Sequence, residues 1–155
     1  MIYVFDTCPL ITMFTYYYKR RFPSLWEKFD SMMGEKRIIS TRENFREIET
    51  QNEDLYQWAR SNKEIFQPPD ADEAAFITQI YSIPHFRSNI EQQKLWKGGI
   101  NADSFVIAKA FIKKGTVVTG EKKKPNAAKI PNICDHFHIP CLDLESFMEK
   151  ENWTF

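Results

Sequence analysis

The sequence predicts an α/β fold in which a short parallel sheet of about four strands carries helices on both faces. Short runs rich in β-forming residues recur at 2–6, 36–40, 116–119 and 141–143. Helical patterns separate these runs, and strands that alternate with helices are typical of a parallel sheet. The chain has 155 residues and is 43% hydrophobic, so we expect one domain over residues 1–155 with a substantial core.

The first half of the chain supplies two of the strands. Pro9 fits the first turn of a helix that follows strand 2–6. Ser24-Leu25-Trp26-Glu27 has the form of a capping box for a second helix, and Gly34 suits the residue after it. Strand 36–40 leads into another capping-box pattern, Ser40-Thr41-Arg42-Glu43, which predicts a helix directly after the strand.

The second half adds helices before and after two further strands. Residues 53–62 are expected to be helical, and Pro68-Pro69 marks the end of this helical segment. Further elements are expected at helix 70–83, a mostly helical region between Pro84 and Gly98-Gly99, a helix from about 102 to 114 ended by Gly115, strand 116–119, a short helix at 132–137, strand 141–143 and a last helix from Leu144.

Charge and cysteine content restrict the function classes. Lysine plus arginine and aspartate plus glutamate number 21 each, and this neutrality argues against a general polyanion binder. Basic clusters are local: Lys122-Lys123-Lys124, and the stretch 16–21, where three tyrosines precede Lys19-Arg20-Arg21. Three cysteines without paired spacing indicate free thiols. With no signal-peptide pattern and no long apolar run, we expect a cytoplasmic protein that does not enter a membrane.

Carboxylates follow two of the predicted strands. Asp6 ends the first strand, and Glu121 comes two residues after Thr119 ends the third. Ligands of parallel α/β sheets bind beyond the carboxyl ends of the strands, so both acids should open onto one crevice. An aspartate that ends a strand also often caps the next helix, and Glu121 beside three lysines could be surface charge.

Two helices bring further acids toward the same crevice. Glu43 and Glu47 share one face of the helix after the second strand, and Glu43 has the alternative role of reciprocal cap to Ser40. Asp103 begins the apolar stripe of Val106, Ile107, Ala110 and Phe111, although a helix-start aspartate can also serve the helix dipole. Converging carboxylates repel unless a cation or protons intervene, and oxygen ligands select Mg²⁺ or Mn²⁺.

Four stretches of the sequence resemble the PIN domain, a metal-dependent ribonuclease fold. These are YVFDT at the start, Glu47 after the second strand, ADSFVIAKA and GTVVTGEK. The sequence is most similar to the PIN-like group described as DUF4411, which resembles VapC-type toxins, and KIPNICDHFHIPCLDLESFMEK resembles the C-terminal stretch of that group. The resemblance covers nearly the whole chain and implies a PIN-like three-layer sandwich.

The resemblance also implies roles for individual residues. Asp6, Glu47 and Asp103 match the three acids that ligate Mg²⁺ or Mn²⁺ in PIN domains. Three further matches are Glu121 at the fourth acid, Thr119 at the hydroxyl residue before it, and Thr7 at the small polar residue after the first aspartate. The helix sequence TRENFREIE lacks the usual small residues, so Glu43 remains a rival for Glu47 as the second acid.

The predicted function is hydrolysis of RNA phosphodiesters by metal-activated water. The family implies a toxin of a toxin–antitoxin pair that forms a homodimer and is blocked by an antitoxin protein. Lys122-Lys123-Lys124 could hold RNA phosphates beside the crevice, the alternative being a solvated face. A second hypothesis is a catalytically silent PIN-like module that acts through a protein or RNA partner.

Two other enzyme classes fit the sequence less well. A haloacid-dehalogenase-type phosphatase needs a second aspartate two residues after the first, where this chain has Cys8. A response-regulator receiver needs a strand and a helix between its threonine and its Lys-Pro pair. Here Lys124-Pro125 begins only five positions after Thr119.

Overall fold

The computed structural model describes residues 1–96 and 101–155 of the chain and contains a five-stranded parallel sheet. The strands lie in the order β3-β2-β1-β4-β5, and each neighbouring pair is parallel. In the central strand Val4 pairs with Ile39 on one side and Val117 on the other. The strands are β1 (Tyr3–Phe5), β2 (Ile38–Thr41), β3 (Phe66–Gln67), β4 (Thr116–Val118) and β5 (Cys141–Leu142).

The predicted α/β class and parallel sheet are confirmed, but the expected count of about four strands is wrong by one. The fifth strand, β3, has two residues and pairs with the end of β2 through Ser40 and Phe66. It lies just before Pro68-Pro69, where the sequence predicted only the end of a helical segment. A strand of two residues shows no alternation of apolar and polar positions, so the pattern could not predict it.

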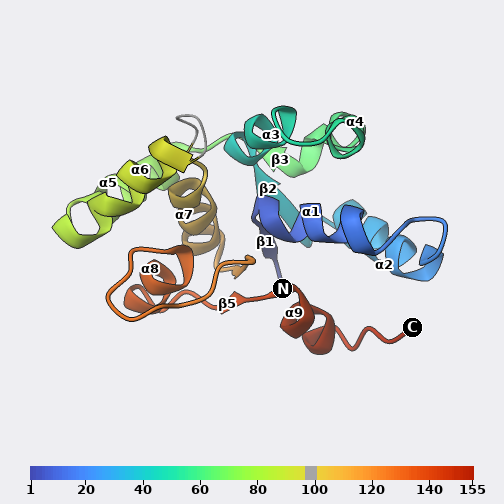
Figure 1. The fold of residues 1–155 in the computed structure, drawn as a ribbon. Coiled ribbons are helices and arrows are strands. Elements are labelled where there is room, and N and C mark those ends of the chain that lie inside the picture. The colour runs from blue at the N-terminus through green and yellow to red at the C-terminus, as the bar shows by residue number, and fades with distance from the viewer. Residues whose placement is uncertain (97–100) are drawn as a thin grey trace.

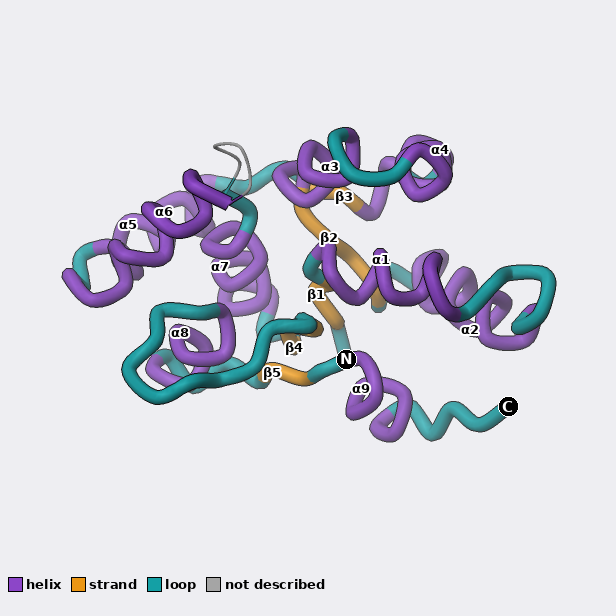
Figure 2. Tube along the Cα trace, viewed as in Figure 1, coloured by secondary structure: helices purple, strands orange, loops and turns teal. Residues whose placement is uncertain are grey.

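Helices cover both faces of the sheet, as Figures 1 and 2 show. The first group, α1 to α4 with α9, lies on one side, and α5 to α8 lie on the other. The Gly98-Gly99 break lies outside the described residues. The helices are α1 (Thr7–Tyr16), α2 (Pro23–Gly34), α3 (Arg42–Glu49), α4 (Glu53–Ser61), α5 (Ala71–Tyr81), α6 (Pro84–Trp96), α7 (Asp103–Lys113), α8 (Ile130–His136) and α9 (Leu144–Lys150), with a 3-10 turn at Lys63–Ile65.

Strand β1 separates the two cores of this three-layer arrangement. Tyr3 and Phe5 point into the core beneath α1, α2 and α9, whereas Val4 points into the core beneath α5, α7 and α8. The ring of Phe147 packs edge-on against Tyr3 at 4.8 Å and against Phe5 at 5.1 Å. All three β1 side chains are fully buried, which explains the unbroken apolar run before Asp6.

Two predicted helix caps are wrong. Helix α2 begins at Pro23 with Phe22 at its N-cap, so Ser24 lies inside the first turn and caps nothing. At α3 the cap is Thr41, whose hydroxyl oxygen accepts from the Asn44 amide at 3.2 Å. Ser40 is still part of β2 and donates its hydroxyl to the Phe5 carbonyl at 2.6 Å. The strand therefore continues one residue further than its pattern indicated, and the cap moves with it.

The apolar stripe on α7 is mostly buried as expected. Val106 and Ile107 are fully buried and Ala110 nearly so, but Phe111 is 43% exposed, so its expected place on the buried face is wrong. Its ring stacks on Phe76 at 4.0 Å instead. Within the described residues, no helix is both long and apolar enough to cross a membrane.

Gly115 allows the chain to pass close to β1 after α7 ends. The left-handed residue that ends the helix is Lys114, with φ 55°, and a Cβ on Gly115 would lie 2.8 Å from the Ile2 carbonyl oxygen. We expect Gly115→Ala to destabilise the protein by about 1–3 kcal/mol, measured by urea unfolding, because backbone must move. Gly34→Ala is the control, since nothing lies within 4 Å of its Cβ position. Equal midpoints for both variants would contradict this account.

Candidate functional site

The candidate site begins where strand order reverses, between β1 and β4. Asp6 and Thr119 directly follow these neighbouring strands, and the Thr119 hydroxyl donates to Asp6 Oδ2 at 3.0 Å. The Asp6 amide in turn donates to the Val118 carbonyl at 2.9 Å. In open parallel sheets this reversal point at the carboxyl ends is the usual ligand crevice. The expected placement of Asp6 and Thr119 at one edge therefore agrees with the structure.

Asp6 does not act as a helix cap. It occupies the N-cap position of α1, yet its side chain accepts no capping hydrogen bond. Instead Asp6 Oδ1 accepts a hydrogen bond from the Asn44 side-chain amide at 3.1 Å, and Asp6 Oδ2 accepts one from the Thr119 hydroxyl. No ion pair with lysine or arginine involves Asp6 in the described part of the chain. Two neutral donors thus fix a carboxylate that is only 2% exposed.

Glu47 is joined to Asp6 through two neutral side chains. Glu47 Oε2 accepts from the Thr7 hydroxyl at 2.8 Å, and Thr7 Oγ1 accepts from Asn44 at 3.0 Å. Because Asn44 also donates to Asp6, helix α3 contributes both an acid and the residue that connects the two acids. Glu47 is 3% exposed, so it is not a solvated helix residue.

Glu43, the rival for the second acid, is also buried but has different contacts. Its Oε1 accepts from Arg42 Nε at 3.1 Å and from Arg42 Nη2 at 2.9 Å. Its Oε2 is buried and accepts no hydrogen bond from the described residues. Glu43 does not cap Ser40, so that alternative is wrong. Among the described residues, hydrogen bonds through Thr7 and Asn44 join Glu47, and not Glu43, to Asp6.

Asp103 begins α7 and is fully buried. Its Oδ2 accepts from the Asn89 side-chain amide at 2.9 Å, and Asn89 also donates to the Ala128 carbonyl at 3.0 Å. The Tyr81 hydroxyl donates to Asn89 Oδ1 at 3.0 Å. Burial raises the pKa of Tyr81, and the Asp103 charge acts in the same direction. Asp103 therefore belongs to a buried polar cluster from α5, α6 and α7.

Glu121 lies at the start of the loop after β4 and has a structural contact. Its backbone amide donates to Thr119 Oγ1 at 3.2 Å, and its Oε2 accepts from the Ile130 amide at 2.9 Å, at the first turn of α8. In α8, a thiol hydrogen bond with Cys141 and burial hold the pKa of Cys134 well above its usual range. The charges of Glu121 and Asp103 raise the pKa of Cys134 in the same direction.

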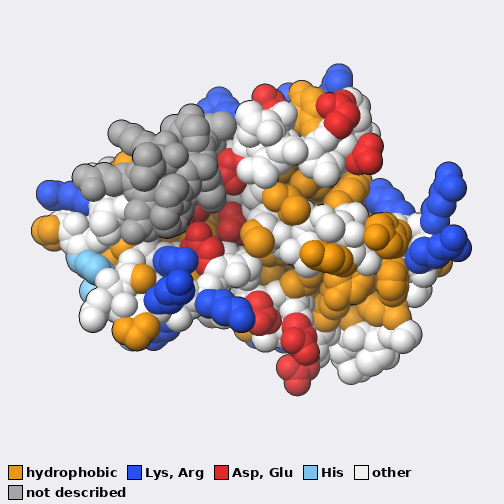
Figure 3. Space-filling view, viewed as in Figure 1, with side chains coloured by type: hydrophobic (Ala, Val, Ile, Leu, Met, Phe, Trp, Pro, Cys, Tyr) orange, Lys and Arg blue, Asp and Glu red, His pale blue; other side chains and the backbone are white. Residues whose placement is uncertain are grey.

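A surface hollow of about 320 Å³ opens beside these residues. Thr119, Glu121, Lys122, Lys123 and Asp143 are among its lining residues. Figure 3 shows acidic side chains near the centre of this face of the molecule and basic side chains directly below them. The arrangement combines carboxylate oxygens with nearby cations, as binding of a phosphate compound with a metal ion requires.

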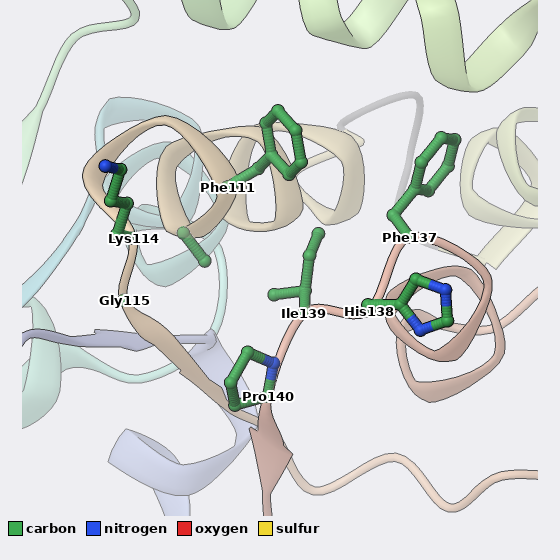
Figure 4. Close-up of a pocket in the computed structure, with 8 residues that line it drawn as sticks. Phe111, Lys114, Gly115, Phe137, His138, Ile139 and Pro140 are labelled. Atoms are coloured by element: carbon green, nitrogen blue, oxygen red, sulfur yellow. The ribbon is translucent and has the colours of Figure 1, made fainter.

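A different hollow, of about 270 Å³, lies at the amino ends of β4 and β5. Figure 4 shows Phe111, Phe137 and His138 around it, with Gly115 just before β4 and Pro140 just before β5. None of its lining residues is acidic. It is therefore separate from the carboxylates at the other ends of the strands.

Comparison with known families assigns the chain to one of them. The model of the family described as "Domain of unknown function (DUF4411)" matches residues 3–155. The chain belongs to the DUF4411 family. A search among curated proteins finds no match. The resemblance to DUF4411 that the sequence showed is therefore confirmed. The matched range includes every residue of the candidate site.

Sequence reasoning found two of the neutral residues that hold the acids, Thr7 and Thr119, but did not find Asn44, Asn89 and Tyr81. Asn44 was identifiable in part, because it lies three positions before Glu47 and therefore on the same side of a helix. Asn89 and Tyr81 gave no such signal, since their link to Asp103 spans separate helices. The predicted acids of this DUF4411 protein lie in their expected elements, and the structure adds their amide and hydroxyl partners.

The residues present suit a hard cation held by few protein ligands. Among the described residues, no three histidine, cysteine, aspartate or glutamate side chains form a group with metal-binding geometry. Magnesium usually keeps several waters and binds one or two carboxylates together with substrate phosphates. Asp6 of this DUF4411 protein, held by neutral donors, provides such a carboxylate. The donor set therefore fits Mg²⁺ or Mn²⁺ in a water-rich site and not in a closed cage.

Proposed function

We propose that this DUF4411 protein is a Mg²⁺- or Mn²⁺-dependent ribonuclease of the PIN type. The observation that supports the proposal best is the network at the point where strand order reverses. There Asp6 is fixed by Thr119 and Asn44, and Thr7 connects the same network to Glu47. Parallel sheets bind ligands in a crevice at the carboxyl ends of their strands, where this network lies. Metal sites that cleave phosphodiesters use carboxylate ligands.

The proposed metal-binding residues are the four acids Asp6, Glu47, Asp103 and Glu121, of which the ion would contact one or two directly and the others through its bound waters. When bound, such an ion supplies a water of lowered pKa and stabilises negative charge on the phosphate. The protein supplies orientation, because Thr119 and Thr7 each donate a hydroxyl to one of these carboxylates. In this proposal Thr119 and Thr7 act as positioning residues, and Lys122, Lys123 and Lys124 attract the phosphates of RNA.

The PIN resemblance extends the proposal to a biological role. In that role the protein is the toxin of a toxin–antitoxin pair in the cytoplasm, forms a homodimer, and is inhibited by an antitoxin protein. The competing proposal is a catalytically silent PIN-like module that binds a protein or RNA partner. One observation favours the silent module. The Glu121 carboxylate accepts a hydrogen bond from the Ile130 amide in the first turn of α8, so Glu121 has a structural role that needs no metal.

RNA cleavage with and without metal distinguishes the two proposals. The purified protein is incubated with a structured RNA and Mn²⁺, and a parallel reaction contains excess EDTA. We expect endonucleolytic products only in the Mn²⁺ reaction, because hydrolysis needs the metal-activated water. Intact RNA in the presence of Mn²⁺ would support the silent module, and equal cleavage in EDTA would contradict a metal-dependent site.

A further inference from the structure

An exposed loop of aromatic and basic residues follows helix α1. We define the aromatic–basic loop as Tyr16, the last residue of α1, together with residues 17–21 that follow it. Tyr16 is 67% exposed and Tyr18 is 59% exposed. Lys19, Arg20 and Arg21 are exposed beside them. Figure 3 shows basic side chains at the right edge of the molecule, where Figure 1 places the connection between α1 and α2.

The loop is held in place, so its exposed tyrosines do not result from a frayed helix end. The Trp26 indole donates to the Tyr17 carbonyl at 2.6 Å, and the Tyr17 and Phe22 rings pack at 5.5 Å. The amides of Arg21 and Phe22 both donate to the Tyr18 carbonyl at 2.9 Å. Because the backbone is already fixed, binding a ligand costs the ordering of the side chains but not the ordering of the loop.

The positive charge of the loop is largely available to a partner. Lys19 lies 4.8 Å from the centre of the Trp26 ring and is partly engaged there. In the described residues no ion pair joins Arg20 or Arg21 to an acid. Guanidinium groups bind phosphates, and exposed aromatic rings stack on unpaired bases, so this combination matches a single-stranded nucleic acid.

A surface hollow connects the aromatic–basic loop with the candidate site. It has a volume of about 410 Å³, and its lining residues are Thr12, Tyr17, Gly120, Leu144, Met148 and the two acids Asp143 and Glu145. Gly120 directly follows Thr119, which holds Asp6. The ten-residue helix α1 extends for about 15 Å along this course, from the residue after Asp6 to Tyr16. A few nucleotides of single strand can span that length.

We propose that the aromatic–basic loop binds single-stranded RNA by stacking bases on Tyr16 and Tyr18 and by pairing phosphates with Arg20 and Arg21. The strand then follows the hollow along α1 toward Asp6. This inference rests on the proposed ribonuclease function for the identity of the ligand. It adds a binding site distant from the carboxylates that selects unpaired RNA over duplex, because only unpaired bases can stack on side chains.

Binding without catalysis tests the loop. A fluorescein-labelled single-stranded RNA is titrated with protein in EDTA, and fluorescence anisotropy gives the dissociation constant. We expect Tyr16→Ala/Tyr18→Ala to weaken binding at least about tenfold, because stacking platforms lose that much or more on truncation. The matched variant Tyr16→Phe/Tyr18→Phe keeps both rings and should bind like the wild type. Duplex RNA should be insensitive to the alanine changes.

The arginines are tested by the dependence of affinity on salt. Each phosphate contact with a single strand contributes about 0.7 to the slope of log affinity against log salt. Arg20→Ala/Arg21→Ala should therefore reduce the slope by about 1.4. Lys113→Ala/Lys150→Ala removes two exposed charges elsewhere and should leave the slope unchanged.

The outcomes separate this inference from the proposed function. Wild-type affinity in the alanine variant, an equal loss in the phenylalanine variant, or no binding by the wild type would each overturn the loop proposal. If the loop changes weaken binding but Mn²⁺ produces no cleavage, the loop proposal stands and the nuclease proposal fails. If Mn²⁺ produces cleavage but the loop changes leave binding unaltered, the nuclease proposal stands and the loop proposal fails.

Discussion

Replacing Asp6 with asparagine is expected to abolish Mn²⁺-dependent RNA cleavage. The change removes the charge that attracts the cation and keeps the shape that Asn44 and Thr119 contact. Loss of a residue that only orients a metal ligand typically costs about 10–100-fold, so loss of the ligand itself should cost more than about 100-fold. Initial rates of RNA cleavage measure the effect, and Thr119→Val should fall within the smaller range.

Stability measurements show whether Asp6→Asn acts through the metal. The metal-free variant should be at least as stable as the wild type, because the change removes the charge of a carboxylate that is only 2% exposed and keeps its shape. Added Mn²⁺ should raise the melting temperature of the wild type, since it binds the folded state, and should raise that of the variant much less. Asp54→Asn is the control, because Asp54 is exposed on α4 and is not one of the residues proposed to bind metal or RNA. Cleavage at the wild-type rate by Asp6→Asn would remove Asp6 from the site.

The backbone order was largely predictable because apolar runs and helix signals agree along this chain. The buried strand before Asp6 and the apolar stripe of α7 each left a clear pattern, and the elements occur where those patterns placed them. Two kinds of detail were not predictable. Strand β3 is too short to show an alternating pattern. The caps predicted at Ser24 and Ser40 depended on helix boundaries, which lie two residues and one residue away from the predicted positions.

The sequence predicted where the acids of the candidate site lie, but not which side chains contact them. Topology alone places Asp6 beside Thr119, because both residues follow strands that are neighbours in the sheet. Glu47 and Glu43 could not be separated by sequence, since both lie on one side of α3. The structure distinguishes them through Thr7, which binds Glu47, and Arg42, which binds Glu43. Contacts of this kind depend on the packing of α3 against α1, which no local pattern encodes.

Helix α7, which presents Asp103, is fixed by a charged pair inside the second core. Lys109 and Glu73 are each 2% exposed, and Lys109 Nζ lies 2.9 Å from Glu73 Oε1. Lys109 also donates to the Pro68 carbonyl at 3.4 Å, and Glu73 accepts from the Asp70 amide at 2.9 Å in the cap of α5. The pair thus ties α7 to α5 and to the chain that enters α5.

We expect Lys109→Met to destabilise the protein by about 3–5 kcal/mol, because it leaves the Glu73 carboxylate buried without its counter-charge. Urea unfolding measures the loss. The double variant Lys109→Met/Glu73→Gln should recover most of it, since glutamine is neutral and its side-chain oxygen can still accept from the Asp70 amide. A single variant that loses less than about 1 kcal/mol, or a double variant no better than the single one, would contradict this role. Since α7 begins at Asp103, the single variant should also lose Mn²⁺ stabilisation, which the double variant should regain.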